Sequence, residues 1–373
     1  MNIGMNVSRL GGQRLGVGRY IEYMLQYWSK MLGPDERVNA YLRAELSIES
    51  TAHLKLGENI RMEVVRPNFP GMLWENLAMA FHARHDDVFF GPAYSVPLLL
   101  RTPRKRVVAT HSVYEEADWK YNFTYGARDK YCARTASAVI VPCASTADQV
   151  AKHYGIPHQR LFSIPQGAPP AFRPVKDAAA QRRTRIELLG GDVPFVVFVG
   201  RLSARRNIPN LVAGFAKAKK LKGLPHKLLL FGPKNVDLPL AEICREHGVT
   251  QDVVQTTGCI SKHEDLVQIY NAAEIFIQPS YYEGWSITTV EAMACGTAVV
   301  AADSGALGEI ARGHAYMLKD PTADAIADAL IKVLLDERLK DDLRQLARQR
   351  GSTMTWERTT GETLEIIRHV ARS

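Results

Sequence analysis

Short apolar runs rich in β-branched residues alternate with helix-length segments along the whole chain. In the first half these runs are Met1–Val7, Val38–Leu42, Met62–Val65, Val88–Phe90, Arg106–Thr110 and Ala138–Val141. In the second half they are Phe195–Val199, Lys227–Phe231, Val253–Gly258, Glu274–Gln278 and Thr297–Ala301. Such alternation is typical of α/β proteins whose parallel sheets carry helices on both faces. We therefore predict doubly wound parallel sheets, and a chain of 373 residues is long enough for two domains with separate cores.

Composition indicates an ordinary globular chain. Five cysteines are scattered, and no pair has the C-x-x-C spacing, so we expect reduced thiols in a cytoplasmic protein without a structural zinc site. The chain opens directly with a strand-like run, and we expect no signal peptide. No apolar run approaches the roughly 20 residues that a membrane-spanning helix needs.

The positive charge is concentrated in the first half. The formal net charge is +8, and residues 1–173 carry 21 lysines and arginines against 15 acidic residues. A basic half is compatible with an anionic membrane surface, an anionic acceptor or a nucleic acid, although ordinary solubility charge explains it equally well. No nucleic-acid-binding motif is recognisable, so we expect no nucleic-acid partner.

The most informative stretch runs from Tyr281 to Gly296. It follows one predicted strand and precedes another, so it reads as a loop and a short helix. We predict that Thr288 caps this helix in a capping box with Glu291, and that Gly296 ends it. The loop then lies at the carboxyl end of a strand and the amino end of a helix, where α/β proteins bind anions. Capping alone would account for Glu291, but not for Glu283.

Three further features follow predicted strands. Gly16 and Gly18 belong to a glycine-rich loop that fits neither the P-loop nor the G-x-G-x-x-G spacing, and such a loop is a phosphate-binding backbone or a plain tight turn. His111 ends a strand and is either a loop residue or part of a site. Arg201 and Arg206 are two cations that suit a diphosphate, although a surface cluster has the same spacing.

Residues 114–131 combine aromatic and basic side chains. Aromatic faces stack on sugars and cations pair with phosphate. We predict that Trp119, Lys120, Tyr121 and Arg128 contribute to acceptor binding. The alternative is a helix that buries its aromatic residues.

Two glutamates separated by seven residues within EGWSITTVEAMACGTAVVA resemble the signature of family 4 of the retaining glycosyltransferases. Trp285-Ser286 and Thr288 stand where Phe-Gly and Pro are usual. The resemblance implies a GT-B fold, with two Rossmann-like doubly wound parallel-sheet domains facing a central cleft. We expect an acceptor-side domain at 1–167, a nucleotide-sugar domain at 168–355, and a terminal helix at 356–373 that crosses back to the first domain.

The same resemblance implies roles for individual residues. Arg201 and Arg206, the latter replacing the usual Lys, would face the donor diphosphate, while Glu283 and His111 would hold the donor sugar. Glu291 would bind the ribose. The remaining donor-binding residues would be Gly16, Gly18, Gly284, Trp285, Ser286, Ile287, Thr288, Cys259 and Ile260. No Asp-x-Asp occurs, so we expect no metal and no cofactor beyond the nucleotide-sugar substrate. Gln166 stands where related enzymes have Asn.

We therefore expect a metal-independent retaining hexosyltransferase. The carboxyl-terminal TWERTTGETL resembles mannosyltransferases of surface-polysaccharide synthesis, which makes GDP-mannose the first candidate donor and a UDP-hexose the second. The expected acceptor is a saccharide, lipid-linked, in polysaccharide, lipopolysaccharide or glycolipid synthesis at the inner face of the membrane. Two alternatives stay open: a nucleotide-sugar epimerase of the same fold, and a non-catalytic subunit that binds sugar nucleotides.

Overall fold

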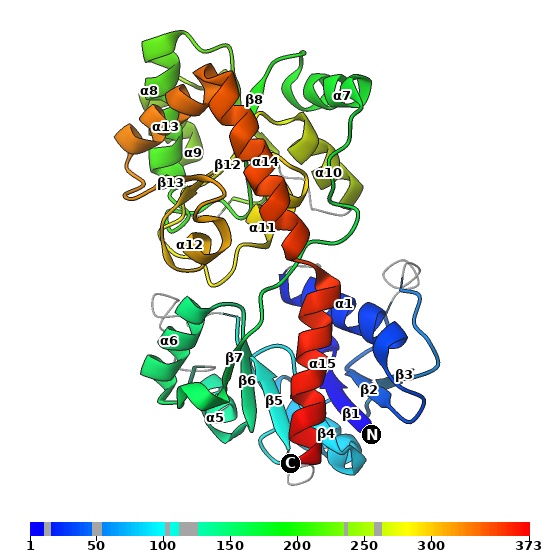
Figure 1. Cartoon of the computed structure of the whole chain (residues 1–373). Coiled ribbons are helices and arrows are strands. Elements are labelled where there is room, and N and C mark those ends of the chain that lie inside the picture. Colours follow the sequence, from blue (N-terminus) through cyan, green and yellow to red (C-terminus); the bar gives the residue numbers. More distant parts are fainter. Residues whose placement is uncertain (11–15, 47–53, 101–104, 112–125, 235–237, 257–262) are drawn as a thin grey trace. The chain divides into compact units, whose positions relative to one another are not determined.

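The chain forms two compact α/β units. The computed structural model describes residues 1–10, 16–46, 54–100, 105–111, 126–234, 238–256 and 263–373. Unit 1 comprises residues 1–166 and 356–373, and unit 2 comprises residues 167–355. Figure 1 shows the elements of each unit.

Unit 1 is built on a parallel sheet of seven strands in the order β3-β2-β1-β4-β5-β6-β7. The strands are β1 (Asn2–Asn6), β2 (Arg37–Leu42), β3 (Ile60–Val64), β4 (Val88–Gly91), β5 (Arg106–Ala109), β6 (Ala138–Val141) and β7 (Leu161–Ser163). The α-helices are α1 (Gly16–Met31), α3 (Ala80–His82), α5 (Ala127–Thr135), α6 (Ala144–Tyr154) and α15 (Trp356–Arg372). The chain winds first to one side of β1 and then to the other, so the winding reverses between β1 and β4.

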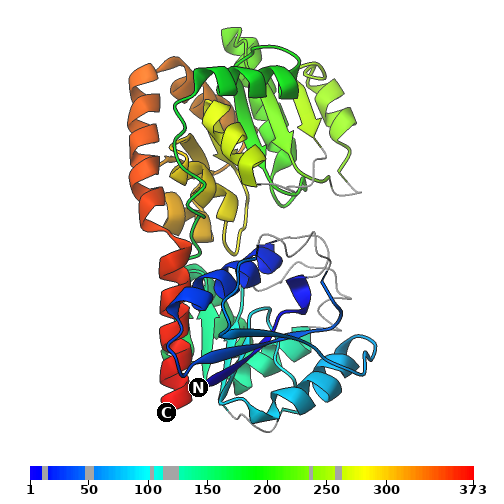
Figure 2. The same cartoon turned by 90° about the vertical axis from the view of Figure 1, so that its right-hand side faces the viewer.

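The terminal helix α15 belongs to unit 1. It lies beside α1 over the middle strands of the sheet, as Figures 1 and 2 show. Trp28 on α1 donates from Nε1 to the Thr360 carbonyl at 2.9 Å, and Tyr23 stacks on Trp356 with ring centroids 4.6 Å apart. Trp28 and Trp356 are fully buried, so the helix is held by a large aromatic contact area.

Unit 2 contains a parallel six-stranded sheet in the order β10-β9-β8-β11-β12-β13. Its strands are β8 (Phe195–Val199), β9 (Lys227–Phe231), β10 (Val253–Thr256), β11 (Ile275–Gln278), β12 (Ala298–Ala302) and β13 (Tyr316–Leu318). Its helices are α7 (Ala178–Leu189), α8 (Ile208–Lys222), α9 (Leu240–Glu246), α10 (His263–Ala272), α11 (Ile287–Ala294), α12 (Gly305–Ala311), α13 (Ala323–Leu335) and α14 (Glu337–Thr353). The winding reverses between β8 and β11, the two central strands.

Alternate residues of the unit 2 strands enter two separate cores. Val196 and Phe198 face a core that includes side chains of α8, α9 and α13, whereas Phe195, Val197 and Val199 face one that includes side chains of α10 and α11. Every residue of β8, β11 and β12 is buried, as expected for a parallel sheet covered on both faces. Among the described residues, no helix is long and apolar enough to cross a membrane.

A buried lysine links α14 to the start of β11. Lys340 is 3 % exposed, and its Nζ lies 2.7 Å from both Glu274 Oε2 and Glu337 Oε1. His226 and Lys340 together hold the pKa of Glu274 at about 2. The ion pair therefore stabilises unit 2 at neutral pH, and this contribution is lost as the pH falls from about 4.5 towards 2.

We expect Lys340→Ala to lower the free energy of unfolding by about 3–5 kcal/mol, because it leaves a carboxylate without its buried partner. Denaturant unfolding of the full chain measures the change. The control is Arg344→Ala on the same helix, whose exposed ion pair with Asp341 contributes at most about 1 kcal/mol. Equal losses in the two variants, or a Lys340→Ala deficit that persists unchanged at pH 2, would contradict this assignment.

Candidate functional site

The loops that follow β8 and β11 meet at one edge of the unit 2 sheet. The two strands are parallel neighbours, so their carboxyl ends lie side by side where the winding reverses. The Tyr281 amide donates to the Arg205 carbonyl at 3.3 Å, and the Arg205 guanidinium donates to the Tyr282 carbonyl. The structure thus brings the predicted arginine loop beside the predicted glutamate loop.

Glu283 lies at the centre of this edge. It is 6 % exposed, and its Oε1 accepts from Gln278 Nε2 at 3.1 Å and from Ser280 Oγ at 3.0 Å. Arg206 Nε lies 3.2 Å from the same oxygen, and Arg205 Nη1 lies 3.8 Å from Oε2. The carboxylate therefore lies between two guanidinium groups, and two hydrogen-bond donors set its orientation.

Arg201 and Arg206 have different surroundings. The side chain of Arg201 is exposed and forms no ion pair with any residue in the described part of the chain. Arg206 is mostly buried and paired with Glu283. Two cations therefore flank the edge, one available to a ligand and one held in place by the protein.

Gly200 makes room for Arg206. Its φ is +143°, and a Cβ at this position would lie 1.9 Å from Arg206 Nη1. The glycine is the first residue after β8, so the chain can pass close to the guanidinium. Sequence reasoning missed the roles of Gly200, Gln278 and Ser280, although Gly200 directly follows one predicted strand and Gln278 ends another.

We expect Gly200→Ala to weaken nucleoside diphosphate binding by roughly tenfold or more, because the added Cβ would take the place of Arg206 Nη1 and move the guanidinium away from this edge of the sheet. Calorimetric titration of the purified full chain measures the affinity. Gly190→Ala is the matched control, because Gly190 also has a positive φ of 74° but has no atom within 4 Å of the added Cβ. If both variants bind equally well, Gly200 has no role in placing Arg206.

The helix that follows Glu283 begins earlier than the sequence predicts. α11 starts at Ile287 with Ser286 as its N-cap, so the capping box with Thr288 is wrong. The Ser286 hydroxyl lies 2.8 Å from Thr289 Oγ1, which places Thr288 inside the first turn. Gly296 follows the helix with a φ of +73°, in agreement with its predicted role at the carboxyl end. The amides of Ile287 and Thr288 precede the first intrahelical hydrogen bonds and point out of the helix start.

The remaining residues of the predicted donor site differ in burial. Gly284 and Ser286 are buried, while Trp285, Ile287 and Thr288 are half-buried at the start of α11. Glu291 is fully buried, with the Tyr270 hydroxyl 3.5 Å from its Oε2, so it does not reach the surface as Arg201 does. Its predicted contact with a ribose stays a prediction. Cys259 and Ile260 lie outside the described residues.

In unit 1, Gly16 and Gly18 are helical. α1 begins at Gly16, so the two glycines form its first turn rather than the predicted loop. A Cβ on Gly18 would lie 3.0 Å from the Arg9 carbonyl oxygen, which explains a small residue there. Both glycines still lie near the carboxyl end of β1.

His111 follows β5 at the same sheet edge as the end of β1. Its Nε2 is 2.8 Å from the Pro92 carbonyl oxygen, and its Nδ1 is 3.0 Å from Gln166 Nε2. Burial lowers the pKa of His111, against the opposing effect of the Pro92 hydrogen bond. The imidazole is therefore neutral at physiological pH, which suits a hydrogen-bonding group rather than a cation.

Arg128 is directed into unit 1. Its side chain is 12 % exposed, and it lies 2.9 Å from Asp129 Oδ1 and 3.7 Å from Glu75 Oε2. Two carboxylates thus compensate its charge, and this placement does not support the predicted acceptor contact. Trp119, Lys120 and Tyr121 lie outside the described residues.

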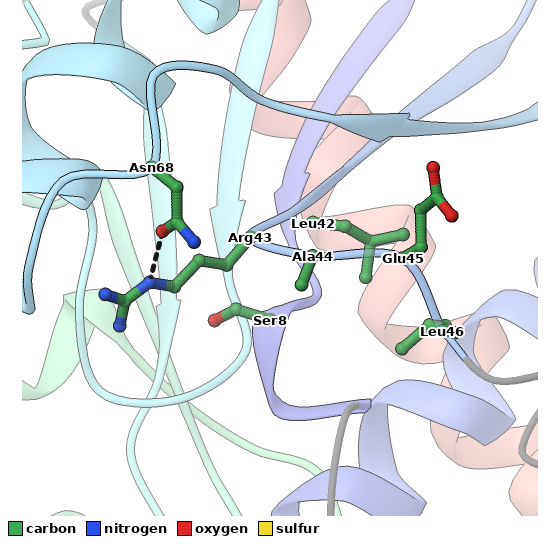
Figure 3. A pocket seen from close by; sticks show the side chains of 7 residues that line it. All are labelled: Ser8, Leu42, Arg43, Ala44, Glu45, Leu46 and Asn68. Atoms are coloured by element: carbon green, nitrogen blue, oxygen red, sulfur yellow. Dashed lines mark hydrogen bonds between the residues drawn. The ribbon is translucent and has the colours of Figure 1, made fainter.

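A cavity of about 300 Å³ opens beside the ends of β1 and β2 in unit 1. Its lining residues are Ser8, Leu42, Arg43, Ala44, Glu45, Leu46 and Asn68. Arg43 donates from Nε to Asn68 Oδ1 at 2.7 Å and from Nη2 to the Phe69 carbonyl at 2.9 Å. Figure 3 shows its guanidinium and the Ser8 hydroxyl turned to one side, with the Glu45 carboxylate turned to the other. Sequence reasoning gave no sign of this cavity.

Metal ligation has no evident place in these regions. Within the described ranges, no three His, Cys, Asp or Glu side chains gather as a metal ion would require. Positive charge at the unit 2 edge comes from the arginines.

Each of the two units matches a known protein family. Residues 16–172 match the family described as Glycosyltransferase Family 4, and residues 181–350 match the family described as Glycosyl transferases group 1. The two matches are consecutive and leave only short segments uncovered. They follow the division of the chain into an N-terminal and a C-terminal Rossmann-like unit.

Individual relatives are distant. D-inositol 3-phosphate glycosyltransferase of Saccharomonospora viridis is 28% identical over 71% of this chain and 59% of its own length. O-antigen chain mannosyltransferase B of Escherichia coli is 29% identical over 46% of this chain and 44% of its own length. The chain thus spans less than two thirds of these curated relatives.

Solved structures match over the full length. HepE of Anabaena, crystallised with UDP and glucose, superposes with a TM-score of 0.79 at 16% identity and covers 99% of this chain and 100% of its own. At this identity the likeness concerns the fold, which is GT-B with one parallel sheet in each unit. The two consecutive family matches show that the chain is a member of glycosyltransferase family 4, a family of retaining enzymes.

Proposed function

We propose that this enzyme transfers a hexose from a nucleotide-diphosphate sugar to a saccharide acceptor with retention of configuration. The observation that carries the proposal is the group formed by Glu283, Arg206 and Arg201 where the unit 2 winding reverses. Cations beside a helix start are suited to a leaving diphosphate. A fixed carboxylate is suited to the hydroxyl groups of a sugar.

In the proposed reaction, each group has one task. Arg201, Arg206 and the first amides of α11 stabilise the negative charge that develops on the diphosphate as the sugar leaves. Glu283 accepts hydrogen bonds from the donor sugar, and Glu291 from the ribose. His111 orients the sugar as a neutral imidazole. The arginines supply the positive charge that a metal ion provides in other transferases, so we propose a metal-independent reaction.

We propose GDP-mannose as the first donor to test and a UDP-hexose as the second. The resemblance of the carboxyl-terminal segment to mannosyltransferases supports mannose, and a curated relative is named an O-antigen chain mannosyltransferase. The proposed acceptor is a saccharide carried on a lipid diphosphate. The cavity beside Arg43 is a candidate place for part of that acceptor, since its wall carries hydrogen-bond donors and an oriented cation.

The experiment is to incubate the enzyme with each nucleotide sugar and a lipid-linked saccharide and to identify the products by mass spectrometry. An acceptor heavier by one hexose is the expected result. A changed nucleotide sugar without a glycosylated acceptor would establish the epimerase instead. Binding of the donor without either product, across acceptors of several chemical classes, would favour the non-catalytic subunit.

Unit 1 has an exposed apolar surface that supports peripheral membrane contact at the cytoplasmic face. Leu73, Leu77 and Phe81 are spaced by four residues along a helical segment and are 55, 44 and 62 % exposed. Figure 2 shows this segment in light blue at the periphery of the unit. Arg84 lies over the Phe81 ring at 3.5 Å, and the only acid in residues 70–85, Glu75, is buried. An apolar surface with an arginine and without exposed acids in this segment suits an anionic bilayer.

We expect Leu77→Ser/Phe81→Ser to reduce sedimentation with phosphatidylglycerol-containing vesicles by roughly tenfold or more. The reason is that the variant lacks two apolar side chains that would insert into the bilayer. Vesicles of phosphatidylcholine alone show the part of the binding that does not depend on charge. Leu221→Ser/Leu335→Ser is the control, since these leucines are equally exposed in unit 2. Membrane contact through this surface is excluded if the two double variants bind alike.

A further inference from the structure

Both ring nitrogens of His111 have partners inside unit 1, and these partners determine which nitrogen carries the hydrogen. Nε2 faces the Pro92 carbonyl oxygen at 2.8 Å, and a carbonyl oxygen can only accept. Nε2 must therefore carry hydrogen. In the neutral ring Nδ1 then has no hydrogen and can only accept, so Gln166 presents its amide NH₂ at 3.0 Å.

The surroundings favour this neutral ring. Tyr20 and Tyr94 meet the imidazole at right angles, with centroids 4.8 and 5.5 Å away. They are the titratable side chains in ring contact with it, and no described residue forms an ion pair with His111. Tyr94 has a φ of +67°, an unusual conformation for a non-glycine residue, and its amide donates to the Ala109 carbonyl at 2.9 Å. The pocket thus holds the ring between two aromatic side chains without a counter-ion.

Gln166 is itself fixed by its neighbours. It is 5 % exposed, and the preceding residue, Pro165, accepts a hydrogen bond at 2.7 Å from Thr359 on α15. The chain leaves unit 1 directly after Gln166. Gln166, which contacts His111, lies 55 residues after it in the sequence. It belongs to a buried segment that the terminal helix holds in place.

We propose that Gln166 is a positioning residue for His111, which it holds in one ring orientation as the neutral tautomer with hydrogen on Nε2. A glutamine amide can donate to a neutral imidazole without introducing charge. A carboxylate in its place would attract a proton to Nδ1 and favour the imidazolium. The inference rests on the proposed function only in its catalytic part, namely that the fixed His111 ring contacts the donor sugar.

The tautomer is measured by two-bond ¹H–¹⁵N correlation spectra of the ¹⁵N-labelled full chain, with His111 assigned through His111→Asn. In the wild type we expect a protonated Nε2, an unprotonated Nδ1, and titration below the ordinary histidine range. Gln166→Glu is expected to protonate Nδ1 and to raise the pKa of His111. Gln166→Leu is expected to keep the low pKa but to shift the Nδ1 resonance, because that nitrogen loses its donor.

Gln159→Glu is the control, since Gln159 is exposed elsewhere in unit 1 and should leave the His111 spectrum unchanged. Identical His111 titration in the wild type and in Gln166→Glu would overturn the proposal. So would a wild-type ring with hydrogen on Nδ1. These spectra need neither donor nor acceptor, so they remain decisive even if the protein transfers no sugar.

The kinetic consequence is tested separately on the active enzyme. A misplaced contact costs turnover more than ground-state affinity, so we expect Gln166→Leu to lower kcat by about tenfold to a hundredfold with little change in donor KM. Gln166→Asn, with the amide that related enzymes carry, is expected to recover part of the loss. Unchanged kcat in Gln166→Leu, with the Nδ1 resonance shifted as expected, would show that the orientation of His111 does not affect turnover.

Discussion

Replacing Glu283 by glutamine is expected to lower kcat by a factor of about 10² to 10³ while the chain stays folded. The glutamine keeps the shape of the side chain and can still accept from Gln278 and Ser280. It lacks the charge that fixes Arg206 at 3.2 Å and that strengthens hydrogen bonds to sugar hydroxyls. The loss therefore falls on the transition state rather than on folding.

The same substitution has an opposite effect on diphosphate binding. The substitution removes the anion that competes with a ligand for Arg206, so nucleoside diphosphate should bind as tightly as before or more tightly. Steady-state kinetics and calorimetric titration separate the two effects. Glu246→Gln serves as the control, because Glu246 is exposed on unit 2 away from this edge. Wild-type turnover in Glu283→Gln would remove this carboxylate from the mechanism.

Arg201→Ala and Arg206→Ala are expected to lower kcat/KM by about 10² to 10³ each, but to differ in stability. Arg201 is exposed and has no ion pair within the described chain, so its removal should leave thermal unfolding unchanged. Removing Arg206 leaves the buried Glu283 with Arg205 at 3.8 Å, which should cost about 1–3 kcal/mol of unfolding free energy.

Two further variants test whether the charge of Arg206 and its position are what matter. Arg206→Lys should recover most of the activity, since lysine is usual at this position in family 4 and keeps the charge. Arg183→Ala, on an exposed helix of the same unit, should change neither activity nor stability. If Arg201→Ala destabilised the chain as much as Arg206→Ala, the distinction between a ligand-facing and a protein-held cation would be wrong.

The central strands of both sheets were predictable because they are buried on both faces. The runs at Val38–Leu42, Val88–Phe90, Ala138–Val141 and Phe195–Val199 agree with β2, β4, β6 and β8 to within a residue at either end. Burial on both faces leaves a continuous apolar run, and the helix-length spacing between runs implies parallel pairing. The apolar runs and the spacing between them are therefore enough to predict parallel sheets.

Helix starts were less predictable. Thr288 and Glu291 have the spacing of a capping box, yet the helix begins at Ile287, and Glu291 is buried against Tyr270. The competing contact, Ser286 with Thr289, involves side chains that local patterns do not rank. Gly16 and Gly18 likewise lie in the first turn of α1 rather than in a loop, and Gly18 is close to the Arg9 carbonyl.

The sequence singles out candidate site residues but not the contacts between them. Arg206 and Glu283 were each identified, but their ion pair depends on β8 and β11 being neighbours in the sheet. Arg205, between the two predicted arginines, also approaches Glu283 for that reason. The contact between His111 and Gln166 spans segments that meet only once β5 and the end of unit 1 are in place. Long-range pairing of this kind leaves no local signal.

In the proposed reaction the enzyme releases a nucleoside diphosphate by transferring the sugar. The most direct measurement is the rate of diphosphate release from a panel of GDP- and UDP-sugars, with and without a lipid-linked saccharide, in the wild type and in Glu283→Gln. We expect release from one donor, strongly increased by the acceptor and nearly abolished in Glu283→Gln. Release that is equal with and without acceptor, or unchanged by the substitution, would contradict it.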